Sequence, residues 1–295
     1  MKFPEGFLWG TATAAHQVEG NNVYSDNWLF EHVPGTIYAE PSGVAIDHYH
    51  RYAEDIALLS ELGFNMYRFY IEWARIEPEE GEFSKASLEH YRRMLVTCHE
   101  HGLTPMVTFH HFTSPRWLIT AGGWESEDTP DRFARYCEHA TRYLGDLIGA
   151  ACTLNEPNIA LLFKQIGIVP PPDSQQYAPW WLAAANTLGI TPDRLVPFVF
   201  GASDQAVDTI LTAHHRAVEA IKAGPGDFPV GLTLALQDIQ AAEGGEEMAA
   251  KLRRLINDVY LENLRADDIV GVQTYSRMRF GPEGPLPPEE GVELT

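Results

Sequence analysis

Apolar residues along the chain alternate between the spacing typical of helices and that typical of strands. Residues 51–62 place apolar side chains at helical intervals and are followed by Gly63, which predicts a helix with a glycine cap. Residues 64–71 form a short apolar and aromatic run, which predicts a strand. The same pattern predicts further strands at 7–13, 104–109, 148–152, 229–235 and 269–274. It predicts further helices at 84–101, 130–147, 204–222 and 246–264.

This alternation implies parallel strands joined by right-handed crossovers, in either a (β/α)8 barrel or an open doubly wound sheet. No Gly-x-Gly-x-x-Gly follows the first strand and no phosphate-binding loop occurs, which argues against a nucleotide-binding sheet. Polar residues instead follow the ends of several predicted strands: Gln17, Arg68, His110, His111, Asn155, Glu156, Gln273 and Tyr275. Barrel enzymes build their sites in this way. We therefore expect a single α/β domain over residues 1–295, of the (β/α)8 TIM-barrel type but with only about six βα units.

Composition narrows the classes of partner. The chain has 295 residues and a formal net charge of −20, which disfavours nucleic acid and anionic membranes and suits neutral or cationic small molecules. The sequence has neither a signal-peptide core nor an apolar run long enough to cross a bilayer. The cysteines, Cys98, Cys137 and Cys152, are widely spaced in apolar sequence, which predicts buried thiols in a reducing compartment. We expect a cytoplasmic protein with no nucleic-acid or membrane partner and no metal or other cofactor.

The segment Thr153-Leu154-Asn155-Glu156-Pro157 lies at the end of the central predicted strand. In a barrel, polar residues at this position face the active side, so Asn155 and Glu156 are candidates for a reaction centre. A structural alternative is that Asn155 caps a helix that begins at Pro157, with Glu156 near the positive end of that helix. The two interpretations are compatible, because a cap also holds the carboxyl in place.

Four further segments, together with residues 153–157, form one recognisable sequence pattern. They are Phe3–Thr13 with Gln17–Gly20, Asp47–Tyr52 continuing to Leu62 and Gly63, Tyr67–Phe69, and Thr108–Phe112 with Pro115. Together they resemble glycoside hydrolase family 1, the β-glucosidase and β-galactosidase group, at family-like spacing through the whole chain. The resemblance implies a (β/α)8 barrel that hydrolyses β-glycosidic bonds with retention of configuration.

The resemblance also implies a role for each polar residue at the strand ends. Glu156 matches the general acid/base, and Asn155 matches the residue that binds the sugar 2-hydroxyl. Arg68 and Tyr275 match the pair that holds the nucleophilic carboxylate. The remaining matches to the substrate-binding groups are Gln17, His111 and Gln273.

Several of these residues have a structural alternative. Gln17 could be a solvated loop side chain, and Arg68 could be half of a structural ion pair. Adjacent residues of a strand point to opposite faces, so we expect His111 to face the sugar and His110 to pack in the core. The aromatic pair Trp180 and Trp181 could line an aglycone site or could pack within its own insertion.

The sequence departs from the family pattern at Phe112, where a Trp is usual, at Gln273, where an Asn is usual, and at Tyr70, where a small residue is usual. After the sixth predicted strand, residues 281–288 are expected to form a loop. The family's last two strands, and the Thr-Glu-Asn-Gly segment that supplies the nucleophile, are not recognisable. Retention requires two carboxyls about 5–5.5 Å apart. Glu72 is the nearest substitute that the sequence offers.

We therefore expect a retaining, β-glucosidase-like hydrolase of small soluble glycosides that is truncated, and that is impaired or dependent on a missing C-terminal part for its nucleophile. One alternative is a catalytically inactive sugar-binding or scaffold remnant of a glycosidase. Another is a barrel lyase or isomerase that uses Glu156 as a proton shuttle. An incomplete barrel exposes two sheet edges, which predicts a complementary C-terminal fragment or a homo-oligomer as partner.

Overall fold

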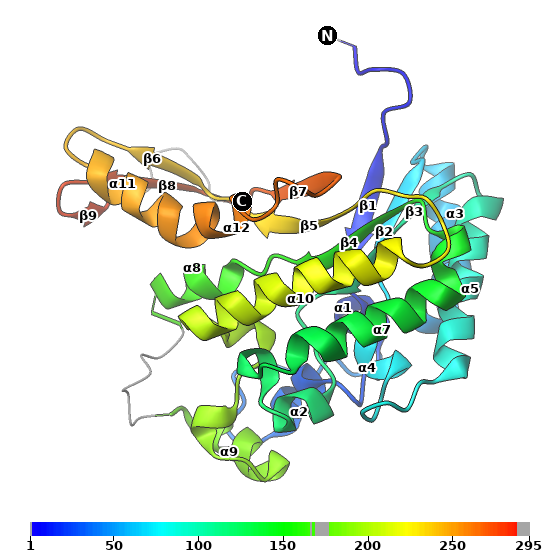
Figure 1. Ribbon diagram of the computed structural model, residues 1–295, viewed down its shortest axis with the longest axis horizontal. Coiled ribbons are helices and arrows are strands. Elements are labelled where there is room, and N and C mark those ends of the chain that lie inside the picture. Colours follow the sequence, from blue (N-terminus) through cyan, green and yellow to red (C-terminus); the bar gives the residue numbers. More distant parts are fainter. Residues whose placement is uncertain (1, 166, 169–176, 288–295) are drawn as a thin grey trace.

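A curled sheet of parallel strands forms the centre of the structure (Figure 1). The computed structural model describes residues 2–165, 167–168 and 177–287. The sheet contains, in spatial order, β1 (Gly10–Thr13), β2 (Met66–Tyr70), β3 (Thr104–His110), β4 (Ala150–Asn155), β5 (Val230–Ala235) and β7 (Ile269–Gln273). Each strand pairs in parallel with the next, as right-handed crossovers require. The prediction of an incomplete barrel of the (β/α)8 type is confirmed, with six strands in the main sheet.

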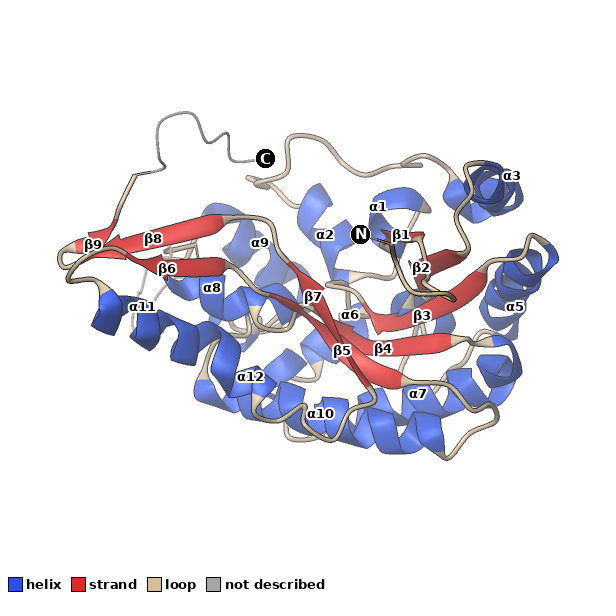
Figure 2. Cartoon of the chain, turned by 90° about the horizontal axis from the view of Figure 1, so that it is seen from above, coloured by secondary structure: helices blue, strands red, loops and turns tan. Residues whose placement is uncertain are grey.

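Long helices between the strands cover the outer side of the sheet (Figure 2). They are α3 (His48–Glu61), α5 (Lys85–Glu100), α7 (Thr129–Leu144) and α10 (Asp204–Lys222). A further helix, α11 (Glu246–Arg253), continues through the π-helical turn η5 (Arg254–Asp258) to α12 (Val259–Leu261), where Tyr260 joins the main core. Helix α5 shows why these segments become helices. The Ser84 side chain caps its first turn, and its buried face carries Leu88, Tyr91, Leu95 and Cys98 at helical spacing. These helices match the predicted ones closely, because each has a long apolar stripe.

Short helices gather beyond the C-terminal ends of the strands. They are α1 (Ala15–Val18), α2 (Asp26–His32), α4 (Trp73–Ile76), α6 (Arg116–Thr120), α8 (Ile159–Gln165) and α9 (Pro179–Leu188), with the 3-10 turns η1 (Gly123–Glu125), η2 (Gly145–Leu147), η3 (Pro192–Arg194) and η4 (Phe198–Phe200) elsewhere in the connections. Trp180 and Trp181 on α9 are buried in a separate apolar cluster with Leu29 and Phe30 of α2. The structure therefore supports packing for the two tryptophans, and not an exposed aglycone platform.

A second, smaller sheet lies beyond the C-terminal ends of β5 and β7 (Figure 1). It contains β6 (Asp238–Ala241), β8 (Arg277–Gly281) and β9 (Gly284–Pro285), and α11 packs against it through Ala249 and Leu252. The expectation of a loop at 281–288 was wrong for Gly281, which ends β8, and for Gly284–Pro285, which form β9. These residues belong to a tight hairpin in which β9 pairs with β8, and β8 is in turn held by pairing with β6. Pro288 lies outside the described residues.

The first and last strands of the main sheet leave its edges open. Within the described part of the chain, β1 pairs only with β2, and β7 pairs only with β5. Val270 and Val272 on β7 are 48% and 58% exposed, whereas every residue of β4 and β5 is buried. Val270 and Val272 are thus apolar side chains that the described helices leave uncovered.

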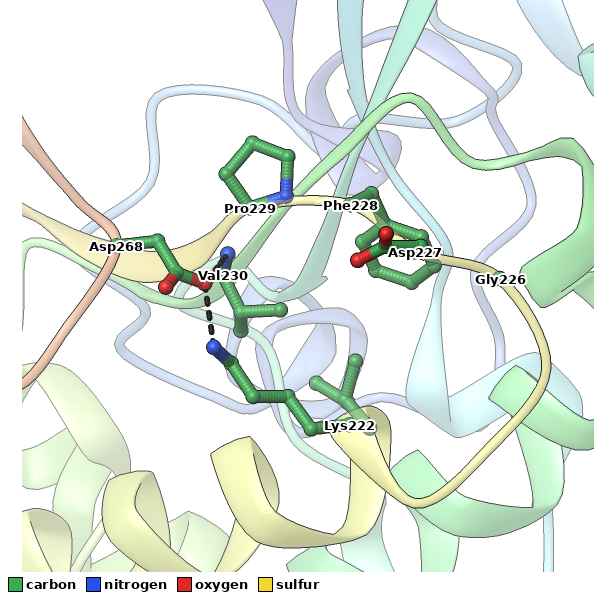
Figure 3. Close-up of a pocket in the computed structure, with 8 residues that line it drawn as sticks. Lys222, Gly226, Asp227, Phe228, Pro229, Val230 and Asp268 are labelled. Atoms are coloured by element: carbon green, nitrogen blue, oxygen red, sulfur yellow. Dashed lines mark hydrogen bonds and ion pairs between the residues drawn. The ribbon is translucent and has the colours of Figure 1, made fainter.

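A cavity of about 460 Å³ lies where β5 and β7 begin, lined by Lys222, Asp268 and residues 226–230 (Figure 3). Asp268 Oδ2 lies 2.6 Å from Lys222 Nζ and accepts a hydrogen bond of 3.0 Å from Val230 N. This ion pair joins the end of α10 to the start of β7. It stands at the opposite end of the strands from Asn155 and Glu156.

The three cysteines are free thiols with buried side chains. Among the described residues, no helix combines the length and the hydropathy that a membrane span requires.

Candidate active site

The central strand β4 ends in an unusual backbone turn. Glu156, directly after the strand, has a φ of 50°, in the left-handed region that residues other than glycine rarely adopt. Its N–H donates to the carbonyl of Thr233 on β5 at 2.8 Å, and the pairing of β4 with β5 shifts register between Cys152 and Asn155. Such strained positions cost about 1–3 kcal/mol and concentrate at functional sites. The turn fixes the direction in which the Glu156 carboxyl leaves the strand.

Three donors converge on the side-chain oxygen of Asn155. Its Oδ1 accepts from Arg68 Nη2 at 2.8 Å, from Gln273 Nε2 at 2.9 Å and from Thr233 Oγ1 at 3.0 Å. This set of donors determines the orientation of the amide, since only the oxygen can accept. The Nδ2 group has no partner within the described residues, so it is the free donor of the side chain. Asn155 does not cap a helix at Pro157, because α8 begins at Ile159 and Oδ1 binds side chains.

Arg68 brings a buried positive charge into the same site. It lies on β2, is 7% exposed, and donates from Nε to Thr108 Oγ1 at 2.8 Å. It forms no ion pair with a carboxylate of the described residues, so the structural ion-pair alternative is not observed. A buried guanidinium without an ion-pair partner favours a carboxylate or developing negative charge beside it.

The carboxyl of Glu156 is buried and hydrogen-bonded. Tyr275 donates from its hydroxyl to Glu156 Oε1 at 2.6 Å. Burial raises the pKa of Glu156 above its ordinary value, and this effect outweighs the Tyr275 hydrogen bond and the Arg68 charge, which both lower it. A carboxyl with a raised pKa retains its proton at higher pH, which suits a general acid.

His111 follows β3 directly, and its imidazole is close enough to Arg68 for the guanidinium charge to act on it. Burial, followed by the charge of Arg68, lowers the pKa of His111 to about 3, so its imidazole is neutral near pH 7. Its Nδ1 is buried without a hydrogen-bond partner in the described part of the chain. The following residue, Phe112, has a φ of 69°, which is a second left-handed position at a strand end. A neutral imidazole can exchange one donor and one acceptor with sugar hydroxyls.

Two other predicted residues lie apart from this hydrogen-bond cluster. His110 is fully buried among aromatic rings, with Nε2 3.0 Å from Ser114 Oγ, in agreement with the packing role expected for it. Gln17 is exposed on α1, just beyond the end of β1, and is therefore on the side where the strands end.

Glu72 has a different environment from the one that a nucleophile needs. It is fully buried at the N-cap of α4, where its side chain accepts from Ala74 N. Its two oxygens also accept from Asn22 Nδ2, Thr113 Oγ1 and Tyr70 OH at 2.7–3.0 Å. Four donors thus hold Glu72 as a structural carboxylate, and Tyr70 fills space beside it.

Two threonines of the site, Thr108 on β3 and Thr233 on β5, were not predicted from the sequence. Both hydroxyls are buried, and each threonine stands between two apolar neighbours in its strand. A threonine among apolar strand residues could have indicated this role, because a buried hydroxyl requires a hydrogen-bond partner.

The chain is similar in sequence to a known enzyme family. The model of the family "Glycosyl hydrolase family 1" matches residues 1–264. The chain is 32% identical to thermostable beta-glucosidase B of Thermobispora bispora, over all of this chain and 65% of the relative. It is 34% identical to beta-glucosidase A of Thermotoga maritima, over 83% of this chain and 52% of the relative. The chain thus spans between half and two thirds of the length of these relatives.

Solved structures show the same arrangement of the backbone. The crystal structure of a beta-glycosidase superposes with a TM-score of 0.95 at 57% identity, and covers 99% of this chain and 70% of that chain. A Thermotoga maritima beta-glucosidase in complex with glucoimidazole gives a TM-score of 0.80 at 28% identity, over 98% of this chain and 70% of that chain.

Proposed function

The chain belongs to glycosyl hydrolase family 1, and we propose that it is the acid/base-bearing part of a retaining, β-glucosidase-like enzyme for small β-glycosides. The observation that carries this proposal is the pairing of a buried Glu156, whose pKa is raised, with the free Nδ2 donor of Asn155. The relatives described as β-glucosidases support the same substrate class. So do solved neighbours in complex with glucoimidazole and deoxynojirimycin, which are sugar-like inhibitors.

The chemistry assigns two opposite proton transfers to Glu156. In the first step it donates its proton to the glycosidic oxygen while a second carboxylate attacks the anomeric carbon and the leaving group departs. In the second step it removes a proton from water, which displaces the carboxylate from the sugar. The Nδ2 of Asn155 donates to the sugar 2-hydroxyl, a hydrogen bond that strengthens in the transition state. The other groups proposed to bind the sugar are Gln17, His111 and Gln273.

The second carboxylate is proposed to come from outside the described residues. Arg68 marks its place, because this buried guanidinium has no carboxylate partner in residues 2–165, 167–168 and 177–287. The open edges at β1 and β7 offer backbone groups to further parallel strands. We infer that residues 1–295 form one domain, completed by a complementary C-terminal segment or by a second copy of the chain.

A second candidate function is sugar binding without hydrolysis. It is favoured by the lack of a second catalytic carboxylate among the described residues. Glu72 accepts from four donors, and no described carboxylate forms an ion pair with Arg68. In that case Asn155 and His111 would hold a sugar, but no glycosyl-enzyme would form.

An aryl β-glucoside with a good leaving group tests the hydrolase proposal. We expect turnover by the complete assembly, a loss of about 10²–10⁴-fold in Glu156→Ala, and partial recovery of that variant with added azide. The matched control is Glu138→Ala, an exposed residue of α7, which should retain activity. A 2-fluoro glycoside followed by peptide mapping then locates the nucleophile. Glucoimidazole binding without turnover supports the second candidate, and neither binding nor turnover overturns both.

We also propose a cytoplasmic location. The three free cysteines are buried and separate, as thiols are in a reducing compartment. Fractionation of the native host, followed by detection of the chain, tests this proposal.

A further inference from the structure

The side chain of Gln17 is held in place only through its backbone. Gln17 is the exposed residue of the turn α1, in which Ala14, Ala15 and His16 are buried. Among the described residues, its amide has no hydrogen-bond partner. The turn itself is closed by the N–H groups of Gln17 and Glu19, which donate to the carbonyls of Ala14 and Ala15 at 3.0 and 2.8 Å. The position of the amide therefore depends on what holds this turn.

Arg75 on α4 binds the two residues that follow α1. Its Nε lies 2.8 Å from Glu19 Oε2, and its Nη2 donates to the carbonyl oxygen of Gly20. The side chains of Arg75 and Glu19 are 14% and 2% exposed, so the ion pair is largely withdrawn from water. Because the nitrogens of a guanidinium leave a rigid plane in different directions, one side chain can hold a carboxylate and a main-chain carbonyl at once.

Arg75 and Glu19 are in turn fixed by residues of two long helices. The guanidinium carbon of Arg75 lies 4.6 Å from the centre of the Tyr49 ring on α3, a distance typical of a cation–π contact. Tyr91 on α5 donates its hydroxyl to the Glu19 carboxylate and lies 3.1 Å from each oxygen. Tyr91 belongs to the main hydrophobic core. The ion pair is thus anchored to the part of the domain that is packed most tightly.

We propose that Arg75 is a positioning residue for sugar binding, which holds the amide of Gln17 beyond the end of β1 through Glu19 and Gly20. The inference rests on the proposed role of Gln17 as a sugar-binding residue. Arg75 does not need to touch the sugar. Without Arg75, the turn samples several positions, and the apparent affinity falls by the fraction of molecules in which the amide is correctly placed. A buried ion pair outside the site thus prepares an exposed side chain for its ligand.

The test requires a variant that removes these contacts without leaving a buried charge. Arg75→Met alone leaves the Glu19 carboxylate without its counter-charge, which destabilises the fold as a whole. Arg75→Met combined with Glu19→Gln, the paired variant, removes both charges. Arg132→Met combined with Glu80→Gln is the matched control. The Arg132 side chain is 16% exposed and its Nε lies 2.8 Å from Glu80 Oε1, but it is on α7.

The pH of the experiments is chosen from the state of Glu19. Burial raises the pKa of Glu19 to about 7, against the opposing effect of the Arg75 charge. We therefore choose about pH 8, where the carboxylate is ionised and the ion pair is complete.

Hydrogen exchange of the full chain, followed by mass spectrometry of the peptides that cover residues 14–22, measures how firmly the turn is held. We expect exchange in these peptides to be about tenfold to a hundredfold faster in the paired variant, because hydrogen bonds to charged groups are lost. The control variant should exchange there at the wild-type rate. Unchanged exchange in residues 14–22 of the paired variant overturns the proposal.

Calorimetric titration with glucoimidazole measures the consequence for sugar binding. We expect the paired variant to bind about tenfold more weakly than the wild type, and Arg75→Lys to keep part of the affinity, since an ammonium retains the charge beside Glu19. In a Gln17→Ala background the paired substitutions should have no further effect, because Arg75 acts through Gln17. An equal loss of affinity in both backgrounds indicates a general effect on the fold and overturns the proposal.

The two measurements separate this inference from the proposed function. Glucoimidazole binding that the paired variant leaves at the wild-type affinity overturns the role of Arg75 and leaves the proposed sugar site intact. A wild-type chain that does not bind glucoimidazole overturns the sugar-binding role of Gln17, and the inference falls with it.

Discussion

Arg68 Nη2 lies 2.8 Å from Asn155 Oδ1 and so joins β2 to β4 across 87 positions of sequence. The same guanidinium reaches Thr108 on β3 through Nε at 2.8 Å. One side chain thus connects three adjacent strands at the end where the candidate site lies. The fork geometry of arginine makes this possible, since its donors leave a rigid plane in different directions.

Arg68→Lys is expected to destabilise the fold although it keeps the charge. A single ammonium on a flexible stem cannot satisfy both Thr108 and Asn155, and a buried acceptor without its donor costs about 1–3 kcal/mol. Urea denaturation should show a loss of this size in the free energy of unfolding. Arg92→Lys is the control, because the Arg92–Asp146 pair is exposed to solvent and should cost about 1 kcal/mol or less. Equal losses in the two variants would contradict the prediction.

Asp26→Asn should reduce the pH dependence of stability. Asp26 Oδ1 accepts from two backbone N–H groups, but Oδ2 is buried without a partner in the described chain, and burial raises the pKa to about 7. The folded state therefore holds this proton more tightly than the unfolded state. Its contribution to stability is complete below the unfolded pKa and is lost as pH rises through the folded pKa.

The wild-type free energy of unfolding should accordingly fall between about pH 4 and about pH 7, by a few kcal/mol from this residue. Asp26→Asn supplies a neutral side chain, so its unfolding curves should show a smaller slope and greater stability at the upper end. Asp131→Asn, at an exposed residue of α7, should keep the wild-type slope. An unchanged slope in Asp26→Asn would sink the idea.

Thr153→Val tests a buried chain of hydrogen bonds behind the site. His214 is fully buried, with Nδ1 2.7 Å from Thr153 Oγ1 and Nε2 3.2 Å from Asp267 Oδ1. Valine preserves the shape but leaves Nδ1 without its partner, so we expect a loss of about 1–3 kcal/mol in thermal or urea unfolding. Thr97→Val, whose hydroxyl is exposed and bonds the Arg93 carbonyl, should cost less. Similar losses would show that burial of the imidazole is not the cause.

Val272→Lys should reduce self-association of the chain. Val272 is 58% exposed on β7, which has a free edge in the described part of the chain. Apolar edge strands promote pairing between chains, and a charge on the edge opposes it. Sedimentation velocity should show association of the wild type that increases with concentration and is weaker in Val272→Lys. Val96→Lys on helix α5 is the control, and a monomeric wild type at every concentration would refute the prediction.

The repeat of strands and helices could be predicted from the sequence because it depends on neighbouring residues. The apolar stripe of α5 and the buried run of β4 each lie within one element, so periodicity indicates them directly. The short helix α4 was not predicted, since a single turn has too few positions for a pattern and depends on its Glu72 cap. The small sheet was missed because β6 and β8 are stabilised by each other, 39 positions apart, and not by local preference.

For the candidate site, the order of residues along the chain is enough to place the polar side chains at the strand ends, and the family resemblance implies their roles. The contacts among these side chains depend on how the sheet folds. The orientation of the Asn155 amide depends on Arg68, Thr233 and Gln273, which lie 87, 78 and 118 positions away. The bond from Tyr275 to Glu156 spans 119 positions. Such contacts depend on the register and curl of the parallel sheet, because these bring distant strand ends within the short range of a hydrogen bond.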